Sequence, residues 1–373
     1  MTLPNPITAG ALLTIDLDAI CDNWRALRGR IAGGGCAAVV KADAYGLGAL
    51  RVAPALHAAG CRHFFVAHVD EGIALRPVLP DDATIFILHG PPPGAEAEVL
   101  AHGLVPVINS LQQLAAWRGL ARQTGRPLPA VLQVDTGMAR LGLTNADLDA
   151  LSADPEALAG IDLKLVMSHL VSAEAPEDPI NSLQLQRFVA ARRRLPSVPA
   201  SLANSSGIFL GPNFHFDLGR PGAALYGVAP MAGAANPMRS VIRLQGKVIQ
   251  TRHIDAGTAV GYGQYWTAAR PTRVATVSVG YADGYLRSLS NRGQVYLDGQ
   301  ALPLVGRVSM DTITIDVTEV PEERIHAGTL IDLAGPDNGV DAIAARAGTI
   351  GYEVLTSLGQ RYARQYVGSG SLP

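Results

Sequence analysis

The chain has 373 residues, of which 48% are hydrophobic and 17% are charged, and its formal net charge is -2. Because one hydrophobic core rarely grows beyond ~250–300 residues, this length favours two domains, and the composition argues against long disordered stretches. The near-neutral charge and the absence of a basic run along a face argue against a nucleic-acid-binding protein.

The first part of the chain repeats a short apolar run that is followed by an Ala- and Leu-rich segment. Strands buried on both faces of a parallel sheet have such continuous apolar runs, and the segments between them are long enough for crossover helices. Eight units of this kind in roughly 200 residues predict an α/β fold, a (β/α)8 TIM-like barrel, with a doubly wound sheet as the alternative. The eight runs are Ala37–Lys41, Phe64–Val69, Thr84–His89, Leu104–Asn109, Ala130–Asp135, Leu163–His169, Ala200–Asn204 and Phe216–Tyr226.

The pattern changes around residues 229–238, where Pro, Gly and Asn indicate a linker. Beyond it, apolar and polar residues alternate, which predicts a mostly antiparallel β domain over residues 239–373 after a barrel over residues 1–238. A helix is expected at Asp341–Ala347 with Asp341 as its N-cap. Residues 1–17 include a strand, Leu12–Leu17, for which pairing with the C-terminal domain is one possibility. The expected β-domain strands are Ser240–Ile254, Thr272–Val279, Gln294–Leu297, Leu302–Val317 and Thr329–Leu333.

Two further patterns bear on compartment and on metal binding. Cys21, Cys36 and Cys61 are odd in number and have no CxxC spacing, so neither a disulfide framework nor a metal site is expected. Residues 1–10 have no features of a signal peptide, and no apolar stretch approaches the ~20 residues of a membrane-spanning helix. We therefore expect a cytoplasmic protein without a membrane partner.

The lysine content draws attention to one position. The chain has 30 Lys and Arg residues, but only Lys41, Lys164 and Lys247 are lysines. Lys41 closes the first predicted barrel strand, and functional groups of such barrels stand at the C-terminal ends of strands. Burial lowers the pKa of a lysine and frees its amine as a nucleophile and base, which makes Lys41 a catalytic candidate.

Other predicted strand ends carry groups that suit a phosphorylated cofactor. Arg140 follows the fifth strand, and His169 ends the sixth. Asn204 and Ser205 end the seventh strand, where small polar residues beside glycine can bind phosphate. Arg220 lies in the eighth. An amine, a phosphate cradle, a histidine and two arginines on one rim are what a pyridoxal phosphate site needs.

Five sequence blocks resemble the alanine racemase family, the pyridoxal-phosphate-dependent enzymes of fold-type III. The resemblance runs through the whole chain. It rests on Val40-Lys41-Ala42-Asp43-Ala44-Tyr45-Gly46-Leu47-Gly48, Asp135-Thr136-Gly137-Met138, Gly280-Tyr281-Ala282-Asp283-Gly284, Gly306-Arg307-Val308-Ser309-Met310-Asp311 and Gly351-Tyr352-Glu353.

The resemblance implies a two-base racemisation of alanine. Lys41 would bind the cofactor's aldehyde covalently and act as one base, and Tyr262 would act on the opposite face of the substrate carbon. The family makes Tyr262 a residue of the partner subunit, so the active sites of a homodimer would be shared. His169 would assist Tyr262 and would in turn be hydrogen-bonded to Arg220, which would also meet the pyridine nitrogen of the cofactor.

The resemblance also implies the remaining site residues. Arg140 would reach both the cofactor and the substrate carboxylate, and Met310 and Asp311 would lie at that carboxylate. The cofactor-binding residues would be Lys41, Tyr45, Arg140, His169, Asn204, Ser205, Arg220, Gly222, Ala223 and Tyr352, and those at the entrance Tyr281, Arg287, Arg307 and Ile350.

One position departs from the family pattern. Many members have a carbamylated lysine two residues before the Asp-Thr-Gly-Met block, where this chain has Gln133. Glutamine cannot be carbamylated and offers only a neutral amide oxygen. We therefore expect no carbamate, and either a hydrogen bond from Arg140 to Gln133 or a bound anion such as chloride.

Four alternative functions fit the sequence less well. A broader amino-acid racemase would usually have a signal peptide and paired cysteines, and a fold-type III decarboxylase would need an acidic residue in place of Arg220. A cofactor carrier made of one barrel would lack residues 239–373, and a generic phosphate-binding barrel would not need Lys41. The sequence leaves open whether D-alanine is made for peptidoglycan or alanine is catabolised.

Overall fold

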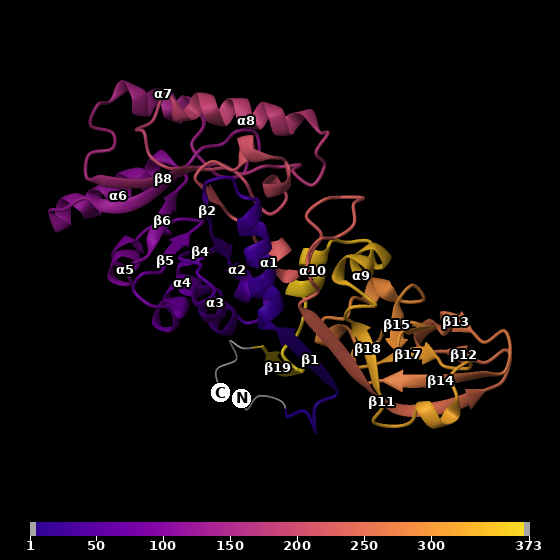
Figure 1. Cartoon of the computed structure of the whole chain (residues 1–373). Coiled ribbons are helices and arrows are strands. Elements are labelled where there is room, and N and C mark those ends of the chain that lie inside the picture. The colour runs from indigo at the N-terminus through magenta and orange to yellow at the C-terminus, as the bar shows by residue number, and fades with distance from the viewer. Residues whose placement is uncertain (1–4, 369–373) are drawn as a thin grey trace. The chain divides into compact units, whose positions relative to one another are not determined.

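The computed structural model describes residues 5–368, which divide into two compact units (Figure 1). Residues 20–238 form the first unit, and residues 239–368 form the second together with the N-terminal residues up to 19. No helix among the described residues is long and apolar enough to cross a membrane.

The first unit is built on a parallel sheet whose strands follow one another in chain order, β3 to β9. Consecutive order without a reversal is that of a curled, barrel-like sheet, so the doubly wound alternative is wrong. The strands are β3 (Ala38–Val39), β4 (His63–Val66), β5 (Thr84–Ile87), β6 (Val105–Ile108), β7 (Leu128–Gln133), β8 (Ile161–Met167) and β9 (Ala200–Ser201). The helices are α1 (Leu17–Arg30), α2 (Lys41–Gly46), α3 (Ala49–Ala58), α4 (Val69–Leu75), α5 (Glu96–Ala101), α6 (Leu111–Thr124), α7 (Asn145–Ala153) and α8 (Pro179–Arg192).

The eighth run closes the ring by main-chain hydrogen bonds on both sides. Strand β10 (Leu218–Gly219) pairs with β2 (Gly35–Cys36), and the amide of Arg220 donates to the carbonyl of Ala203 at 2.9 Å. The expected strand Phe216–Tyr226 is nevertheless wrong beyond two residues, because Pro221 has no N–H for a ladder. Short 3-10 turns replace the last crossover helices: η2 (Gly207–Phe209), η3 (Pro212–Phe214) and η4 (Ala223–Tyr226).

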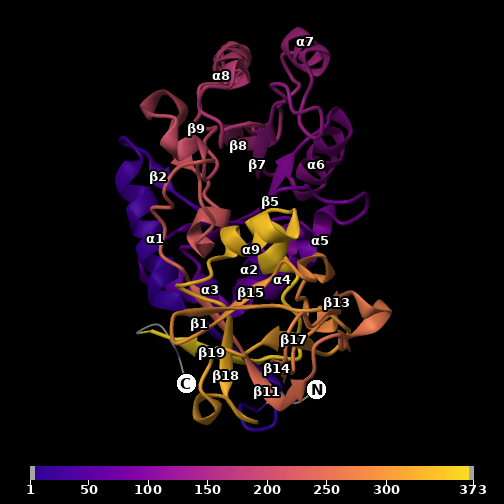
Figure 2. The same ribbon diagram turned by 90° about the vertical axis from the view of Figure 1, so that its right-hand side faces the viewer.

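The second unit is a mostly antiparallel sheet in the order β16-β15-β18-β11-β1-β19, with β14 and β17 extending from β11. Figure 2 labels most of these strands, among them β1, β11, β18 and β19. Strand β1 (Ala11–Asp16) pairs antiparallel with β11 (Ile242–Ile254) and parallel with β19 (Ala363–Val367). The N-terminal strand therefore belongs to this sheet. The other elements are β12 (Ala259–Val260), β13 (Trp266–Thr267), β14 (Thr272–Val277), β15 (Gln294–Leu297), β16 (Gln300–Pro303), β17 (Ile313–Asp316), β18 (Leu330–Ala334), α9 (Val340–Ala347) and α10 (Gly351–Thr356).

Two expectations for this unit are wrong. The run Leu302–Val317 is not one strand, since a loop that turns at Gly306 (φ 82°) separates β16 from β17. A positive φ of this kind favours glycine and interrupts an extended strand. The N-cap of α9 is Gly339 instead of Asp341, which lies inside the helix.

Candidate active site

Lys41 stands where β3 ends, at the start of a left-handed turn. The four residues that follow it, Ala42, Asp43, Ala44 and Tyr45, have φ between 52° and 57°. A left-handed helical conformation costs non-glycine residues about 1–2 kcal/mol each, and such strain concentrates at functional sites. The amide of Gly48 donates to the carbonyl of Asp43 at 2.8 Å and closes the turn.

The surroundings of Lys41 favour its neutral amine. Burial lowers the pKa of Lys41, the positive charge of Arg140 lowers it further, and Glu71 opposes the shift. A lysine with a lowered pKa has a larger fraction of free amine, which is the form that attacks an aldehyde or accepts a proton.

A small buried cradle lies beside this turn. The hydroxyl oxygen of Ser205 accepts hydrogen bonds from the amides of Gly222 at 2.9 Å and Ala224 at 3.2 Å. A side chain at Gly222 would overlap the hydroxyl of Tyr45, so these groups meet in a space that admits no Cβ. Ala223, which begins η4, is buried at the same turn. Convergent amides and hydroxyls fit a phosphate group.

Asn204 holds the loop before this cradle. Its side-chain oxygen accepts a hydrogen bond from the amide of Gly207 at 2.8 Å. This contact caps the turn that presents Ser205. Asn204 therefore shapes the cradle through the backbone.

Arg220 is buried among groups that carry no negative charge. Its guanidinium donates to the carbonyl of Ser168 at 2.6 Å and to the hydroxyl of Ser201, and it forms no ion pair within residues 5–368. Burial lowers the pKa of Arg220 to about 9, which leaves it protonated at neutral pH. A fixed donor of this kind suits an uncharged ring nitrogen.

His169 is held as a neutral imidazole. Burial and the nearby charges of Arg220, Arg140 and Lys41 lower its pKa to about 3. The expected hydrogen bond between His169 and Arg220 is not formed in the described part of the chain. Gln184, which the sequence did not reveal as important, is fully buried and donates to the carbonyl of His169 at 2.9 Å.

Arg140 lies on an exposed loop that is organised by Asp135. One carboxylate oxygen of Asp135 accepts from the amides of Gly137 and Met138, both at 2.9 Å. Gln133 is buried at the end of β7, and its side chain makes no hydrogen bond to Arg140 within residues 5–368. Of the two expected substitutes for the carbamate, the hydrogen bond from Arg140 to Gln133 is therefore not formed.

Most of the predicted residues of the second unit lie on its loops and turns, and Tyr352 lies in helix α10; several of them expose large side chains. Tyr262, in the turn η5 (Tyr262–Gln264), is 75% exposed, and Met310 is 53% exposed. Tyr281 and Tyr352 are also exposed, as is Ile350, which is the N-cap of α10. Exposed apolar groups gathered on neighbouring loops are typical of a surface that another chain covers.

Main-chain contacts bring several of these loops together. The amide of Tyr281 donates to the carbonyl of Ser309 at 3.0 Å, and that of Ala282 to Met310 at 3.0 Å. Asp311, expected at the substrate carboxylate, forms an ion pair with Arg361 at 2.7 Å. Arg361 also contacts both oxygens of Asp283. No pattern in the sequence pointed to Arg361.

Arg307 and Arg287 belong to the same group of loops. The guanidinium of Arg307 lies 4.6 Å from the ring centre of Tyr265, and its buried Nε has no hydrogen-bond partner among the described residues. Arg287 begins the turn η7 (Arg287–Leu289), and the hydroxyl of Ser290 links its carbonyl, at 2.6 Å, to the amide of Val308, at 3.0 Å.

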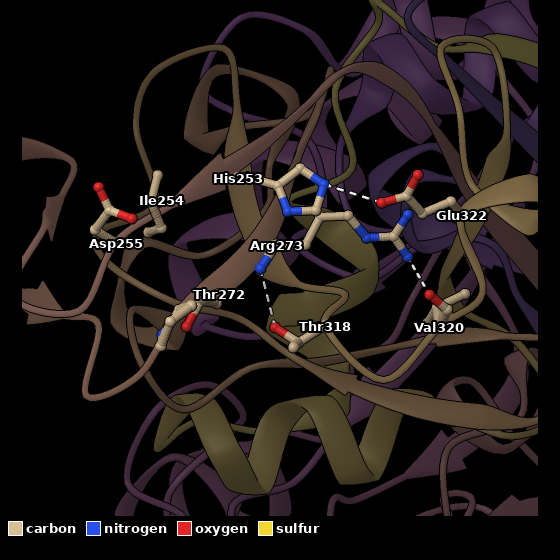
Figure 3. A pocket seen from close by; sticks show the side chains of 9 residues that line it. His253, Ile254, Asp255, Thr272, Arg273, Thr318, Val320 and Glu322 are labelled. Carbon is tan, nitrogen blue, oxygen red and sulfur yellow. Dashed lines mark hydrogen bonds and ion pairs between the residues drawn. The ribbon is translucent and has the colours of Figure 1, made fainter.

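A separate cavity of about 330 Å³ in the second unit contains none of the predicted residues (Figure 3). His253 pairs with Glu322 at 3.0 Å across it, and Arg273 donates to the carbonyls of Val317 and Val320. Because the side chains of His253 and Arg273 already have hydrogen-bond partners, the cavity is a poor site for an anionic ligand.

Comparisons with known proteins cover both units. Residues 15–230 match the family model of the alanine racemase N-terminal domain, and residues 241–366 match that of the C-terminal domain. The chain belongs to the alanine racemase family. An alanine racemase of Rhodospirillum rubrum is 57% identical over 361 residues, which are 96% of each chain. A catabolic alanine racemase of Mesorhizobium japonicum is 52% identical, over 96% of this chain and 94% of the relative.

Solved structures of alanine racemases agree with the fold. That of Bartonella henselae, which has covalently bound pyridoxal phosphate, matches with a TM-score of 0.93 and 43% identity, over 96% of this chain and 100% of that chain. The biosynthetic alanine racemase of Pseudomonas aeruginosa matches with a TM-score of 0.89 and 34% identity, over the same shares.

Family membership makes this alanine racemase a pyridoxal-phosphate-dependent isomerase. When bound, the cofactor withdraws electrons from the substrate carbon and so acidifies its C–H bond. The barrel unit fits this group, because it combines a lysine of lowered pKa with a buried donor cradle that a Cβ would fill. The protonated Arg220, buried without a carboxylate, fits the cofactor's ring nitrogen.

Proposed function

We propose that the enzyme interconverts L-alanine and D-alanine by a two-base mechanism in which Lys41 and Tyr262 move the proton. The observation that carries this proposal is the lowered pKa of Lys41 at the end of β3, next to a phosphate-sized donor cradle. Lys41 takes or returns a proton on one face of the substrate carbon as a free amine. Tyr262 does the same on the other face through its phenolic oxygen.

His169 and Arg220 would prepare this reaction. An imidazole that remains neutral can accept a hydrogen bond from the hydroxyl of Tyr262 and so favour loss of its proton. Arg220 would donate to the ring nitrogen of the cofactor without giving up a proton. The ring would then be a weaker electron acceptor, which limits side reactions.

The other residues would bind the cofactor and the substrate. Tyr45, Ser205, Gly222, Ala223 and Tyr352 would hold the phosphate, with Asn204 shaping the loop. Arg140 and the amide of Met310 would hold the substrate carboxylate, and Asp311 would hold the Met310 loop through Arg361. The entrance would be lined by Tyr281, Arg287, Arg307 and Ile350. Because no hydrogen bond joins Gln133 to Arg140, we propose a bound anion beside Arg140.

We further propose that the active enzyme is a homodimer in which Tyr262 and Met310 serve the partner's barrel. The exposure of both side chains supports this assembly. The buried cysteines form no disulfide within residues 5–368, which suits a reducing compartment such as the cytoplasm. The enzyme would either supply D-alanine for peptidoglycan or begin alanine catabolism, and the relatives include one named biosynthetic and one named catabolic.

Racemisation of L-alanine and L-serine should be measured side by side for the wild type and Tyr262→Phe, by chiral chromatography. We expect alanine to be preferred, because tyrosines at the entrance leave room for little more than a methyl group. Tyr262→Phe should lose at least about a hundredfold of its rate in both directions, since the second proton carrier is gone.

Tyr265→Phe is the matched control, as Tyr265 is an exposed tyrosine three positions away. It should keep most of the activity. If Tyr262→Phe retains wild-type rates in both directions, Tyr262 is not a base. If serine is racemised as fast as alanine, the enzyme is a broader racemase.

A further inference from the structure

The carboxylate of Glu71 joins the ends of two neighbouring barrel strands. One oxygen accepts a hydrogen bond from the amide of Ala42, directly after Lys41, at 2.6 Å. The other oxygen accepts from the amides of Ala67 at 2.7 Å and His68 at 3.0 Å, directly after β4. Glu71 itself lies in the first turn of α4. One side chain therefore satisfies three main-chain donors at the rim where Lys41 stands.

The bond to Ala42 supports a strained segment. Ala42 is the first residue of the left-handed turn, with φ 52°. Four consecutive non-glycine residues hold this conformation only if their surroundings stabilise it. A hydrogen bond to a carboxylate is about twice as strong as a neutral one, so Glu71 is well suited to stabilise the turn at its beginning.

Glu71 also supplies negative charge near Lys41. The positive charge of Arg140 lowers the pKa of the Lys41 amine. The imidazoles of His89 and His169 also interact electrostatically with Lys41. Glu71 counteracts the effect of Arg140 and of burial on the pKa of Lys41. The same side chain thus affects both the geometry and the protonation of the lysine.

We propose that Glu71 is a positioning residue of the racemase: it fixes the turn that carries Lys41 and balances the positive charge around the lysine amine. This inference rests on the proposed role of Lys41. It goes beyond that role because it assigns the alignment of the lysine to a side chain on the next strand–helix unit. A residue that only capped α4 would leave the lysine amine unchanged, which gives the proposal a distinct readout.

The experiment compares Glu71→Gln, Glu71→Asp and the control Asp70→Asn in the full chain before and after pyridoxal phosphate is added. Asp70 is the preceding exposed carboxylate of α4 and has no hydrogen bond or ion pair within residues 5–368. Reductive 13C-methylation gives few NMR signals, because the chain has three lysines, and their titration reports the pKa of Lys41 directly. Retention of pyridoxal phosphate and the pH profile of kcat are measured on unmethylated protein from the same preparations, because a dimethylated Lys41 amine cannot bind the cofactor's aldehyde.

We expect Glu71→Gln to lower the pKa of Lys41 and to weaken retention of pyridoxal phosphate about tenfold, since an amide cannot replace both acceptor oxygens. Glu71→Asp should restore the Lys41 pKa at least in part, and Asp70→Asn should match the wild type. Melting curves check that each variant folds. If Glu71→Gln does not fold, the Lys41 pKa and the cofactor retention of Glu71→Asp are compared with those of Asp70→Asn instead.

The proposal is overturned if Glu71→Gln lowers only the melting temperature and leaves both the Lys41 titration and cofactor retention unchanged. Failure of the underlying function looks different. Borohydride reduction of the wild type with pyridoxal phosphate would then not label the peptide that contains Lys41. That result would remove the proposed function whatever the Glu71 variants show.

Discussion

At the scale of single residues, the barrel unit shifts the pKa values of several buried ionisable groups away from their ordinary values. The pKa of Lys41 is lowered, so its amine is more readily free, and that of His169 falls to about 3, so its imidazole stays neutral. Arg220 keeps its proton although it is buried without an acid. Burial is the largest cause in all three cases. These shifts destabilise the fold and are what a proton-transfer site requires.

The neutral state of His169 predicts a loss of stability in acid. Between pH 6.5, the ordinary pKa of histidine, and the folded value of about 3, the unfolded chain binds a proton at this residue that the folded chain does not. The free energy of unfolding should therefore fall as pH falls through this range, by up to about 1.4 kcal/mol per pH unit from His169.

Denaturant melts from pH 7 to pH 4 test whether the free energy of unfolding falls as the pH falls. His169→Gln should flatten the pH dependence, and a control at the exposed His326, His326→Gln, should not. An unchanged slope in His169→Gln would mean that His169 takes up its proton in the folded state.

At the scale of elements, the cradle depends on short turns in place of regular crossover helices. After β9 and β10 the chain forms η2, η3 and η4, and this brings the amides of Gly222 and Ala224 to the hydroxyl of Ser205. The missing side chain at Gly222 provides the space for the Tyr45 hydroxyl.

Substitution of Gly222 by alanine should damage the cradle specifically. The added Cβ would overlap the hydroxyl of Tyr45, so Tyr45 or η4 must shift, and affinity for pyridoxal phosphate should fall at least about tenfold. Gly29→Ala is the matched control, because nothing lies within 4 Å of a Cβ there and Gly29 is in helix α1.

Gly29→Ala should stabilise the fold by about 0.5–1 kcal/mol and leave the cofactor affinity unchanged. Cofactor fluorescence titration and thermal melts give both quantities. Equal cofactor affinity in Gly222→Ala and the wild type would show that the cradle does not hold the phosphate.

At the scale of the whole molecule, the residues of the proposed site are divided between two compact units. Lys41 and the cradle belong to residues 20–238, and Tyr262 and Met310 belong to the other unit. The loops that carry Tyr262, Tyr281 and Met310 expose these side chains in the single chain. Such exposure is costly for an isolated protein and is explained if a second copy covers the loops.

Mixing two inactive variants tests whether sites are shared. Lys41→Ala and Tyr262→Phe should each be inactive alone. If Tyr262 serves the partner's barrel, a mixed dimer has one site with both defects and one intact site. Random re-association should then restore about a quarter of the wild-type specific activity.

Racemisation is measured after the two variants are partly unfolded together and refolded. The control is a mixture of the same proteins that are refolded separately. No recovery in the co-refolded sample, when each variant elutes as a dimer, would show that each chain completes its own site.

The sequence alone predicted the architecture, which the structure confirms, and it named candidate residues for the chemistry. Continuous apolar runs followed by helical segments are a local pattern, and so is the later alternation of apolar and polar residues, so both units could be predicted. Lys41, Arg140 and Arg220 could be named as candidates because each follows or lies in a predicted strand. The family blocks then supplied the residues of the loops, such as Tyr262 and Met310.

Only the tertiary structure decided how these residues are held. Glu71, Gln184 and Arg361 act through partners 29, 15 and 78 positions away, and no spacing in the chain reveals such contacts. The left-handed turn after Lys41 is likewise invisible, because its sequence has ordinary non-glycine residues where φ is positive. Local propensity fixes what an element prefers, whereas long-range hydrogen bonds and burial decide which strained conformation and which protonation state the site keeps.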